Sequence, residues 1–178
     1  MNNEPQSIGF NPISDKRSRV LILGSMPGGA SLEAQQYYAH PRNAFWPIMG
    51  RMFGASHELA YQERQRILRD HGVAVWDVLA SCIRPGSLDA NIRGDSLQPN
   101  DFIGFFREHP RIKKVYFNGA KAAQLYRRLV LPLLPEHSDR GEQLPSTSPA
   151  HAAMPFEEKL QKWRQVADFI AADSPPGA

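Results

Sequence analysis

The sequence predicts an α/β fold, a three-layer α/β/α sandwich around a short parallel sheet of about four strands. The first observation is a set of short apolar runs at residues 20–23, 73–76 and 114–117, whose length and branching suit strands buried on both faces. A weaker fourth run covers residues 143–147. The second observation is that segments with helical spacing separate these runs. Strands joined in this way pair in parallel through right-handed crossovers, with helices on both faces.

Length and composition fit one domain over residues 1–178. A chain of 178 residues, 42% of them hydrophobic, can bury roughly 70% of the surface that it exposes when unfolded. Residues 1–18 are polar and contain Pro5 and Pro12, which predicts an extended N-terminal arm, and we expect a flexible tail at residues 173–178. No apolar run reaches the length of a membrane span, and residues 1–12 lack the apolar core of a signal peptide. We therefore expect a cytoplasmic protein.

The single cysteine limits the chemistry that the chain can support. Cys82 alone can build neither a disulfide framework nor a multi-cysteine metal or iron–sulfur cluster within the chain. We expect it to be a small buried residue.

The helices are predicted from apolar spacing and from their ends. Asn43 is placed to cap the first of them, and Asn100 can cap the third. The helical segments are 44–52, 56–70, the segment carrying Phe102, Phe105 and Phe106, 120–130, and one long helix after Pro155. Residues 81–99 have neither a helical nor an alternating period, and loops of this length are often functional.

The strand ends are where a ligand site is expected. The first strand runs into residues 24–29, Gly-Ser-Met-Pro-Gly-Gly, whose glycines let a ligand approach the backbone closely. Residues 37–46 follow, where aromatic rings, a cation and a carboxamide lie close together in sequence. In open α/β sheets, ligands bind at the carboxyl ends of the strands, so both segments belong to one expected site.

Charge alone does not identify a partner. The 21 Lys and Arg residues against 18 Asp and Glu residues make the chain only mildly basic. Basic residues gather between 107 and 114 and between 121 and 128. Such runs usually form a solvated face, and contact with phosphate is the alternative that their position in the fold decides.

Five motifs in this order resemble the uracil-DNA glycosylase superfamily, and most closely the hypoxanthine (deoxyinosine) DNA glycosylases. They are GSMPG at 24–28, YYAHPRNAFW at 37–46, GVAVWDVL at 72–79, FNGAKA at 117–122 and STSPAHA at 146–152. The first two together are quite specific. The resemblance implies a monofunctional enzyme that flips a deaminated base out of DNA and hydrolyses its N-glycosidic bond, without metal or cofactor.

The resemblance assigns the catalytic position to Met26, where the family usually carries an acidic or amide residue that orients the attacking water. A thioether cannot remove a proton or hold a water strongly. By resemblance to the hypoxanthine DNA glycosylases, the nearby Asn43 is the first candidate, and its amide oxygen can aim a water at the anomeric carbon. The alternative is that Asn43 only caps the following helix, and the two roles conflict only if Oδ1 is committed to the cap. His151 is the second catalytic candidate, and solvent exposure is its alternative.

The base-binding residues implied by the resemblance are Gly24, Ser25, Met26, Tyr38 and Asp77. The Tyr38 ring lies where relatives place an aromatic face against the flipped base, with packing in the core or rim as the alternative. Asp77 takes the place of a base-reading Asn, and an ionised carboxylate would accept from the ring N–H of hypoxanthine or uracil. The alternative for Asp77 is bonding to backbone amides of the loop.

The DNA-binding residues implied by the resemblance lie in two loops. Aligning the prolines of STSPAHA with the family's minor-groove loop puts the inserted wedge at Ala150 and His151, and puts Ser146 at the usual catalytic His. Ser25 in the first loop and Ser148 and Pro149 in the second would pinch phosphates, and Pro27 and Gly28 are further DNA-binding residues of the first loop.

The resemblance therefore implies excision of hypoxanthine first, and of uracil or xanthine after it, by a monomer whose partner is DNA containing deaminated bases. A second hypothesis is a catalytically weak or inactive protein of this fold that binds damaged or single-stranded DNA, because Met26 lacks the usual catalytic group. A third is an enzyme acting on small nucleotides, which the absence of G-x-G-x-x-G and of a G-K-[ST] phosphate loop disfavours.

Overall fold

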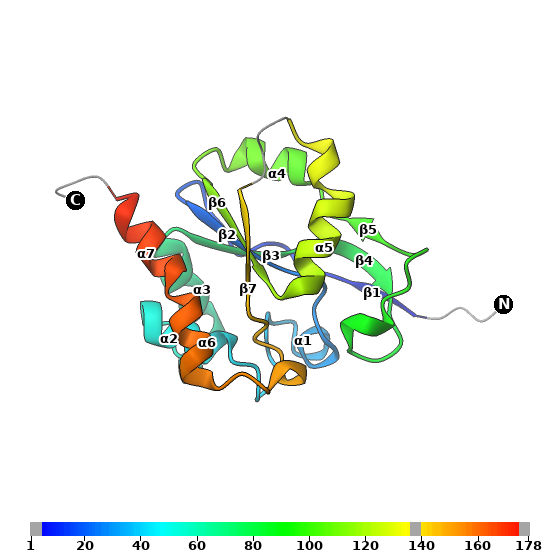
Figure 1. Ribbon diagram of the computed structural model, residues 1–178, viewed down its shortest axis with the longest axis horizontal. Coiled ribbons are helices and arrows are strands. Elements are labelled where there is room, and N and C mark those ends of the chain that lie inside the picture. The colour runs from blue at the N-terminus through cyan, green and yellow to red at the C-terminus, as the bar shows by residue number, and fades with distance from the viewer. Residues whose placement is uncertain (1–4, 136–139, 175–178) are drawn as a thin grey trace.

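The computed structural model describes residues 5–135 and 140–174. Its centre is a parallel sheet of four strands in the order β3-β2-β6-β7 (Figure 1). These strands are β2 (Val20–Gly24), β3 (Val73–Asp77), β6 (Lys114–Asn118) and β7 (Gly141–Leu144). Every residue of β2 and β3 is buried, as the unbroken apolar runs predicted.

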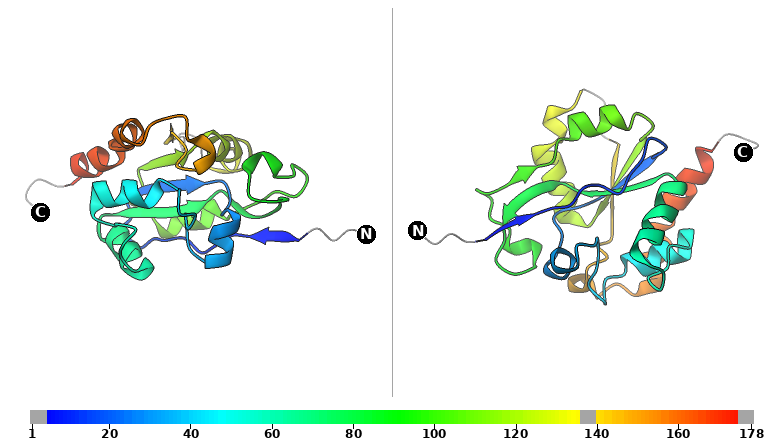
Figure 2. Two further views of the ribbon diagram at one scale, coloured as in Figure 1. Left: turned by 90° about the horizontal axis from the view of Figure 1, so that it is seen from below. Right: turned by 180° about the vertical axis from the view of Figure 1, so that it is seen from behind.

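Helices cover both faces of this sheet, which confirms the predicted three-layer sandwich (Figure 2). One face carries α5 (Ala120–Leu129), α6 (Phe156–Trp163) and α7 (Gln165–Ala172). The other carries α1 (Gly29–Ala34), α3 (Tyr61–Asp70) and α4 (Phe102–Glu108). Helix α2 (Phe45–Phe53) packs against α6 through Phe45 and Trp163, and against α3 through Trp46 and Tyr61.

A second, antiparallel sheet corrects the predictions for the N-terminal arm and for the long connection 81–99. The arm is extended at β1 (Gln6–Ile8), but it pairs with β4 (Leu79–Ile83), which also pairs with β5 (Gln98–Pro99). Cys82 of β4 is buried, as expected. The pairing partners are about 75 residues apart, as in Gln6 and Ile83, so no local pattern could indicate them.

Several predicted boundaries are wrong for local reasons. Helix α3 begins at Tyr61 rather than at residue 56, and the final helix divides into α6 and α7 around Arg164. Asp101 rather than Asn100 caps α4, since its carboxylate accepts from the Gly104 N–H at 2.9 Å. Strand β7 covers residues 141–144 rather than 143–147, because Pro145 has no N–H to continue the ladder.

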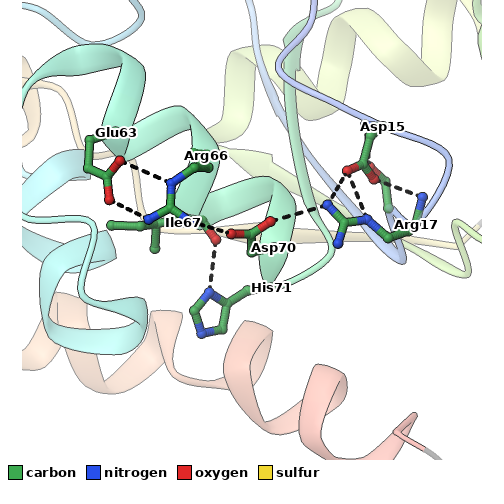
Figure 3. A network of polar contacts seen from close by, with 8 residues as sticks. Asp15, Arg17, Glu63, Arg66, Ile67, Asp70 and His71 are labelled. Atoms are coloured by element: carbon green, nitrogen blue, oxygen red, sulfur yellow. Dashed lines mark hydrogen bonds and ion pairs between the residues drawn. The ribbon is translucent and has the colours of Figure 1, made fainter.

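A chain of ion pairs fastens the residues before β2 to helix α3 (Figure 3). Arg17 contacts Asp15 at 2.7 Å and Asp70 at 3.2 Å. Asp70 also pairs with Arg66 at 3.0 Å, and Arg66 contacts Glu63. These side chains are partly or largely exposed, so each pair contributes little by itself. The network therefore links the chain entering β2 to α3 but contributes little to the stability of the fold.

The two ends of the chain differ in part from the sequence prediction. Asp173, in the predicted flexible tail, pairs with Lys113 at 2.6 Å, and the Ser174 hydroxyl accepts a hydrogen bond from Arg19 at 3.0 Å. Residues 1–4 of the predicted arm and 175–178 of the predicted tail lie outside the described residues. Within the described ranges, no helix is both long and apolar enough to cross a membrane.

Candidate active site

The ends of neighbouring parallel strands define the floor of the site. Gly24 at the end of β2 pairs with Asp77 at the end of β3, and Leu23 pairs with Phe117, which precedes Asn118 at the end of β6. A cavity of about 320 Å³ opens above these ends. This volume is at the lower end of the roughly 300–1,000 Å³ of small-molecule sites.

All twelve residues that the sequence assigned to catalysis, base binding or DNA binding line this cavity. They are Gly24, Ser25, Met26, Pro27, Gly28, Tyr38, Asn43, Asp77, Ser148, Pro149, Ala150 and His151. The structure thus brings together four segments that are far apart in the sequence. Their positions agree with the expected site, whereas their chemical roles stay predictions.

Gly24 is required by the close approach of two polar side chains. A Cβ added to Gly24 would lie 2.4 Å from Oδ1 of Asp77 and 3.0 Å from the hydroxyl of Tyr38. The 2.4 Å contact is shorter than a real Cβ can make, so any larger residue would push the Asp77 carboxyl away and crowd the Tyr38 hydroxyl. The glycine therefore allows Asp77 and Tyr38 to converge at the end of β2.

The Asp77 carboxyl is buried, and one of its two oxygens has no hydrogen-bond partner in the described part of the chain. The side chain is 3% exposed, and Oδ2 has no hydrogen-bond partner among the described residues. Burial and the nearby Asp89 raise the pKa of Asp77 to about 8, although Arg84 opposes this shift. At neutral pH the group is therefore mainly a carboxylic acid, which donates one hydrogen bond and also accepts.

The raised pKa favours a neutral Asp77 over the ionised acceptor that the sequence suggested, and the role of Asp77 in base binding stays a prediction. The alternative interpretation was that Asp77 bonds to backbone amides of the loop. The structure disfavours it, because no backbone N–H of the described residues donates to the Asp77 carboxyl. Instead, the Asp77 backbone carbonyl accepts from Nδ2 of Asn100 at 2.8 Å, so Asn100 holds the strand end rather than a helix end. Strongly shifted carboxyls in a cavity are frequent at functional sites.

Tyr38 has a conformation that needs support from its surroundings. Its φ of 54° lies in the left-handed region, which is rare for a non-glycine residue. Phe45 stacks on the ring with a centroid distance of 4.0 Å, so one ring face is already covered. The hydroxyl is buried near Asn118 without a hydrogen bond of good geometry to a described residue, and burial together with the nearby Asp77 raises its pKa, which keeps it a donor.

Asn43 both supports helix α2 and faces the cavity. Its Oδ1 accepts from the Phe45 N–H at 2.9 Å, although Ala44 occupies the formal N-cap position. An amide oxygen has two acceptor positions, so this bond fixes the side chain and leaves one position for a further donor. The capping contact and the proposed water contact are therefore compatible.

Met26 occupies the cavity wall as a buried, uncharged side chain. Its carbonyl is within 3.5 Å of the guanidinium of Arg84, which also donates to the carbonyl of Pro27. Arg84 is a buried cation that the sequence analysis missed, because only the fold brings β4 beneath the first loop. It fixes that loop through two consecutive carbonyls.

Asn118 is a second residue that the sequence analysis did not assign to the site. It donates to the Thr147 hydroxyl and accepts from the Thr147 N–H, each at 2.9 Å. The Thr147 carbonyl in turn accepts from the N–H of Ala44 at 3.0 Å, next to Asn43. The sequence feature that could have pointed to Asn118 is the Asn-Gly pair at the end of a predicted strand, which is a common turn sequence.

The loop after β7 forms the outer wall. Residues Pro149–His151 make a 3₁₀ turn, η3, which Ser148 caps by accepting from the Ala150 N–H at 3.2 Å. Ala150 and His151 are exposed, as a loop that contacts DNA requires. The buried Lys159 donates to the His151 carbonyl at 3.1 Å and holds the turn from below.

The basic residues singled out by the sequence do not all face this cavity. Lys114 is the first residue of β6, at the edge of the sheet opposite the cavity, where it pairs with Glu142 at 2.8 Å. Lys113 pairs with Asp173. For these two residues, a place on a solvated face of the protein therefore fits better than contact with phosphate. Within the described residues, no group of three or more His, Cys, Asp or Glu side chains could hold a metal ion.

Fold and cavity define an α/β/α domain with a ligand pocket at the carboxyl edge of its parallel sheet. A family model described as the uracil DNA glycosylase superfamily matches residues 11–169. The chain belongs to the uracil DNA glycosylase superfamily, which comprises DNA glycosylases.

Individual relatives agree with this assignment. A protein of Methanosarcina acetivorans named hypoxanthine DNA glycosylase is 34% identical over 159 residues, covering 89% of this chain and 96% of that protein. One of the same name from Methanosarcina barkeri is 36% identical over 117 residues, covering 65% and 73%. A solution NMR structure from Methanosarcina acetivorans, named as a candidate uracil DNA glycosylase, has a TM-score of 0.76 and 30% identity. It covers 94% of this chain and 99% of that one.

The raised pKa of Asp77 predicts a pH-dependent stability difference. An unfolded Asp loses its proton near pH 4, with a pKa of about 3.9, whereas the folded carboxyl keeps it up to a pKa of about 8. Between these values the folded state binds more protons, so the free energy of unfolding falls as the pH rises. The Tm of Asp77→Asn minus that of wild type should therefore increase from pH 5 to pH 8 and level off above.

Thermal unfolding of both proteins across this pH range measures the difference. In an Asp89→Asn background the levelling should move to lower pH, because Asp89 helps to raise the pKa of Asp77. A difference that stays constant from pH 5 to pH 9 would show that Asp77 is ionised in the folded protein.

Proposed function

We propose that this protein excises hypoxanthine from DNA by rotating the damaged nucleotide into the cavity and hydrolysing its N-glycosidic bond. Uracil and xanthine are the further substrates. The observation that carries the proposal is the buried Asp77 carboxyl, whose Oδ2 has no hydrogen-bond partner among the described residues, on the floor of a base-sized cavity at the strand ends. The activity named for the two Methanosarcina relatives supports it.

The donor and acceptor pattern of the floor suits a deaminated base. Hypoxanthine and uracil each present a ring N–H beside a carbonyl. A neutral Asp77 can accept from that N–H and donate to the carbonyl, and the Tyr38 hydroxyl offers a second donor. Such contacts satisfy polar groups that are otherwise buried without partners, so binding removes an existing penalty.

Bond cleavage needs stabilisation of the departing base and placement of a water. The N-glycosidic bond breaks with its electron pair moving to the base, whose growing negative charge the donors on the cavity floor stabilise. The water held by Oδ1 of Asn43 bonds to the anomeric carbon and releases a proton to solvent, while the base takes up a proton. Met26 supplies no base, so the mechanism relies on orientation rather than on general-base catalysis.

The DNA backbone would lie across the exposed loops around the mouth of the cavity. Ser148, Pro149, Pro27 and Gly28 all line the cavity, and in this proposal they contact phosphates flanking the flipped nucleotide. His151 is exposed at the same mouth and in this arrangement contacts DNA. A monomeric state and a cytoplasmic location remain predictions.

Met26 supports a second candidate function, a DNA-binding protein of this fold without effective catalysis. Such a protein would bind damaged or single-stranded DNA with salt-sensitive affinity but would not release a base. The two functions differ in turnover and not in binding.

Single-turnover excision on a substrate panel tests the proposed function. We expect release of hypoxanthine from inosine-containing duplexes, with slower release from uracil and xanthine duplexes and none from undamaged DNA. Binding to each duplex is measured in parallel by fluorescence anisotropy. Affinity for damaged DNA without release of any base would contradict the proposal and support the binding function.

Asn43→Ala should reduce excision from inosine-containing DNA by at least about 10²-fold and leave DNA binding largely intact, because a positioned water is lost. The matched variant Asn43→Ser keeps an oxygen that can accept from the Phe45 N–H, and thus separates catalysis from support of helix α2. Both variants should lose activity, whereas only Asn43→Ala should lose stability. Full activity in either variant would remove Asn43 from catalysis.

A further inference from the structure

The loop predicted to enter DNA, residues 146–152, carries no Phe, Leu, Ile or Met, and the small ring of Pro149 is its largest apolar side chain. Proteins that unstack DNA commonly insert a large apolar side chain where the helix is opened. Ala150 offers only a methyl group, and His151 is a polar ring whose backbone is held in the η3 turn. If a nucleotide leaves the stack, the space behind it has no obvious occupant from this loop.

Leu88 is placed to fill that space. It is 55% exposed and lines the cavity. The other large exposed apolar side chains of the described residues, Ile8, Leu59, Ile103 and Leu133, do not line it. A single exposed leucine is ordinary on a protein surface, so its position at the mouth of the cavity is the informative feature.

The segment that carries Leu88 is fastened to the first loop at two points. The Ser87 hydroxyl accepts from the Gly29 N–H at 2.9 Å. Arg84, whose side chain is 1% exposed, donates to the carbonyl of Pro27 and lies 3.9 Å from Oδ1 of Asp89. These contacts on both sides of Leu88 hold it against the wall formed by the first loop.

The local chain turns sharply before Leu88. Gly86 has a φ of 75°, which a residue with a side chain would adopt only with strain, and Asn91 donates to the Pro85 carbonyl at 3.0 Å. The turn carries residues 87–89 to the cavity, and Ser87, Leu88 and Asp89 all line it. Leu88 is therefore presented at the mouth by a braced turn, and ordering it on binding carries little entropic penalty.

We propose that Leu88 is the wedge of this protein: its side chain enters the DNA stack and occupies the space left by the flipped nucleotide. This inference rests on the proposed excision function. It moves the wedge from Ala150 and His151 to the segment between β4 and β5. Apolar contact with the flanking bases then replaces part of the stacking that flipping disrupts.

The test compares excision from duplex and single-stranded DNA of the same sequence. In a single strand there is no paired stack to open, so a wedge matters only in the duplex. Leu88→Ala should lower single-turnover excision from the inosine duplex by about tenfold or more, which is the scale of one lost base-stacking contact. The single-turnover rate of excision from the single strand should differ from that of wild type by less than about twofold.

Three further variants sharpen the comparison. Leu133→Ala removes an equally exposed leucine from η2 (Leu131–Leu133), away from the cavity, and should change neither rate. Ala150→Leu in the Leu88→Ala background should recover part of the duplex rate, because it restores an apolar group at the mouth. His151→Ala tests the rival wedge.

If the wild-type protein does not excise from single-stranded DNA, a second measurement replaces the comparison of the two substrates. With 2-aminopurine beside the inosine in the duplex, Leu88→Ala should reduce the fluorescence increase that reports unstacking on binding. Equal loss on both substrates, an unchanged duplex rate, or a duplex defect found only in His151→Ala would overturn the inference. A wild type that releases no base from either substrate would instead contradict the proposed function.

Discussion

The site depends on the register of β2 between its two parallel neighbours. Gly24 pairs with Asp77, and Leu23 pairs with Phe117. Strands β2, β3 and β6 therefore end at the same level of the sheet, and the loops that follow them surround one cavity. A shift of one residue in β2 would turn its side chains to the opposite face of the sheet. The absence of a Cβ at Gly24 then lets the Asp77 carboxyl and the Tyr38 hydroxyl share the floor.

Thr147 links this floor to the segment that carries Asn43. Its side chain and N–H are held by Asn118 at the end of β6, and its carbonyl receives the N–H of Ala44. The end of β6, which forms part of the cavity floor, thereby also holds the chain at the start of α2. Arg84 supports the first loop in a similar way, because its guanidinium donates to the carbonyls of Met26 and Pro27. Such supporting contacts preorganise a site before the substrate arrives.

Much of the fold follows from local sequence, whereas the individual site residues were assigned by the resemblance to the glycosylase family. Short, β-branched apolar runs such as residues 20–23 favour buried strands, and parallel strands bring their end loops together, so the expected residues lie around one cavity. The pairing of β1 with β4, the Asp101 cap and the break at Arg164 depend on contacts that no local period records. Arg84 and Asn118 escaped notice for the same reason, since their partners are distant in sequence.

The protonation of Asp77 shows most clearly what sequence cannot supply. The residue type suggested an ionised acceptor, whereas burial and the neighbouring Asp89 favour the neutral acid. A group that is uncharged at neutral pH suits a site that must receive an uncharged ring from DNA. Its unpartnered oxygen is a local instability that a bound base can relieve.

The most direct measurement is a crystal structure of the Asn43→Ala variant bound to an inosine-containing duplex. The account predicts the hypoxanthine ring rotated out of the duplex and seated in the cavity, with its N–H and carbonyl edge against Asp77. A complex in which the base remains stacked in the duplex, or occupies another surface while the cavity holds only solvent, would contradict it.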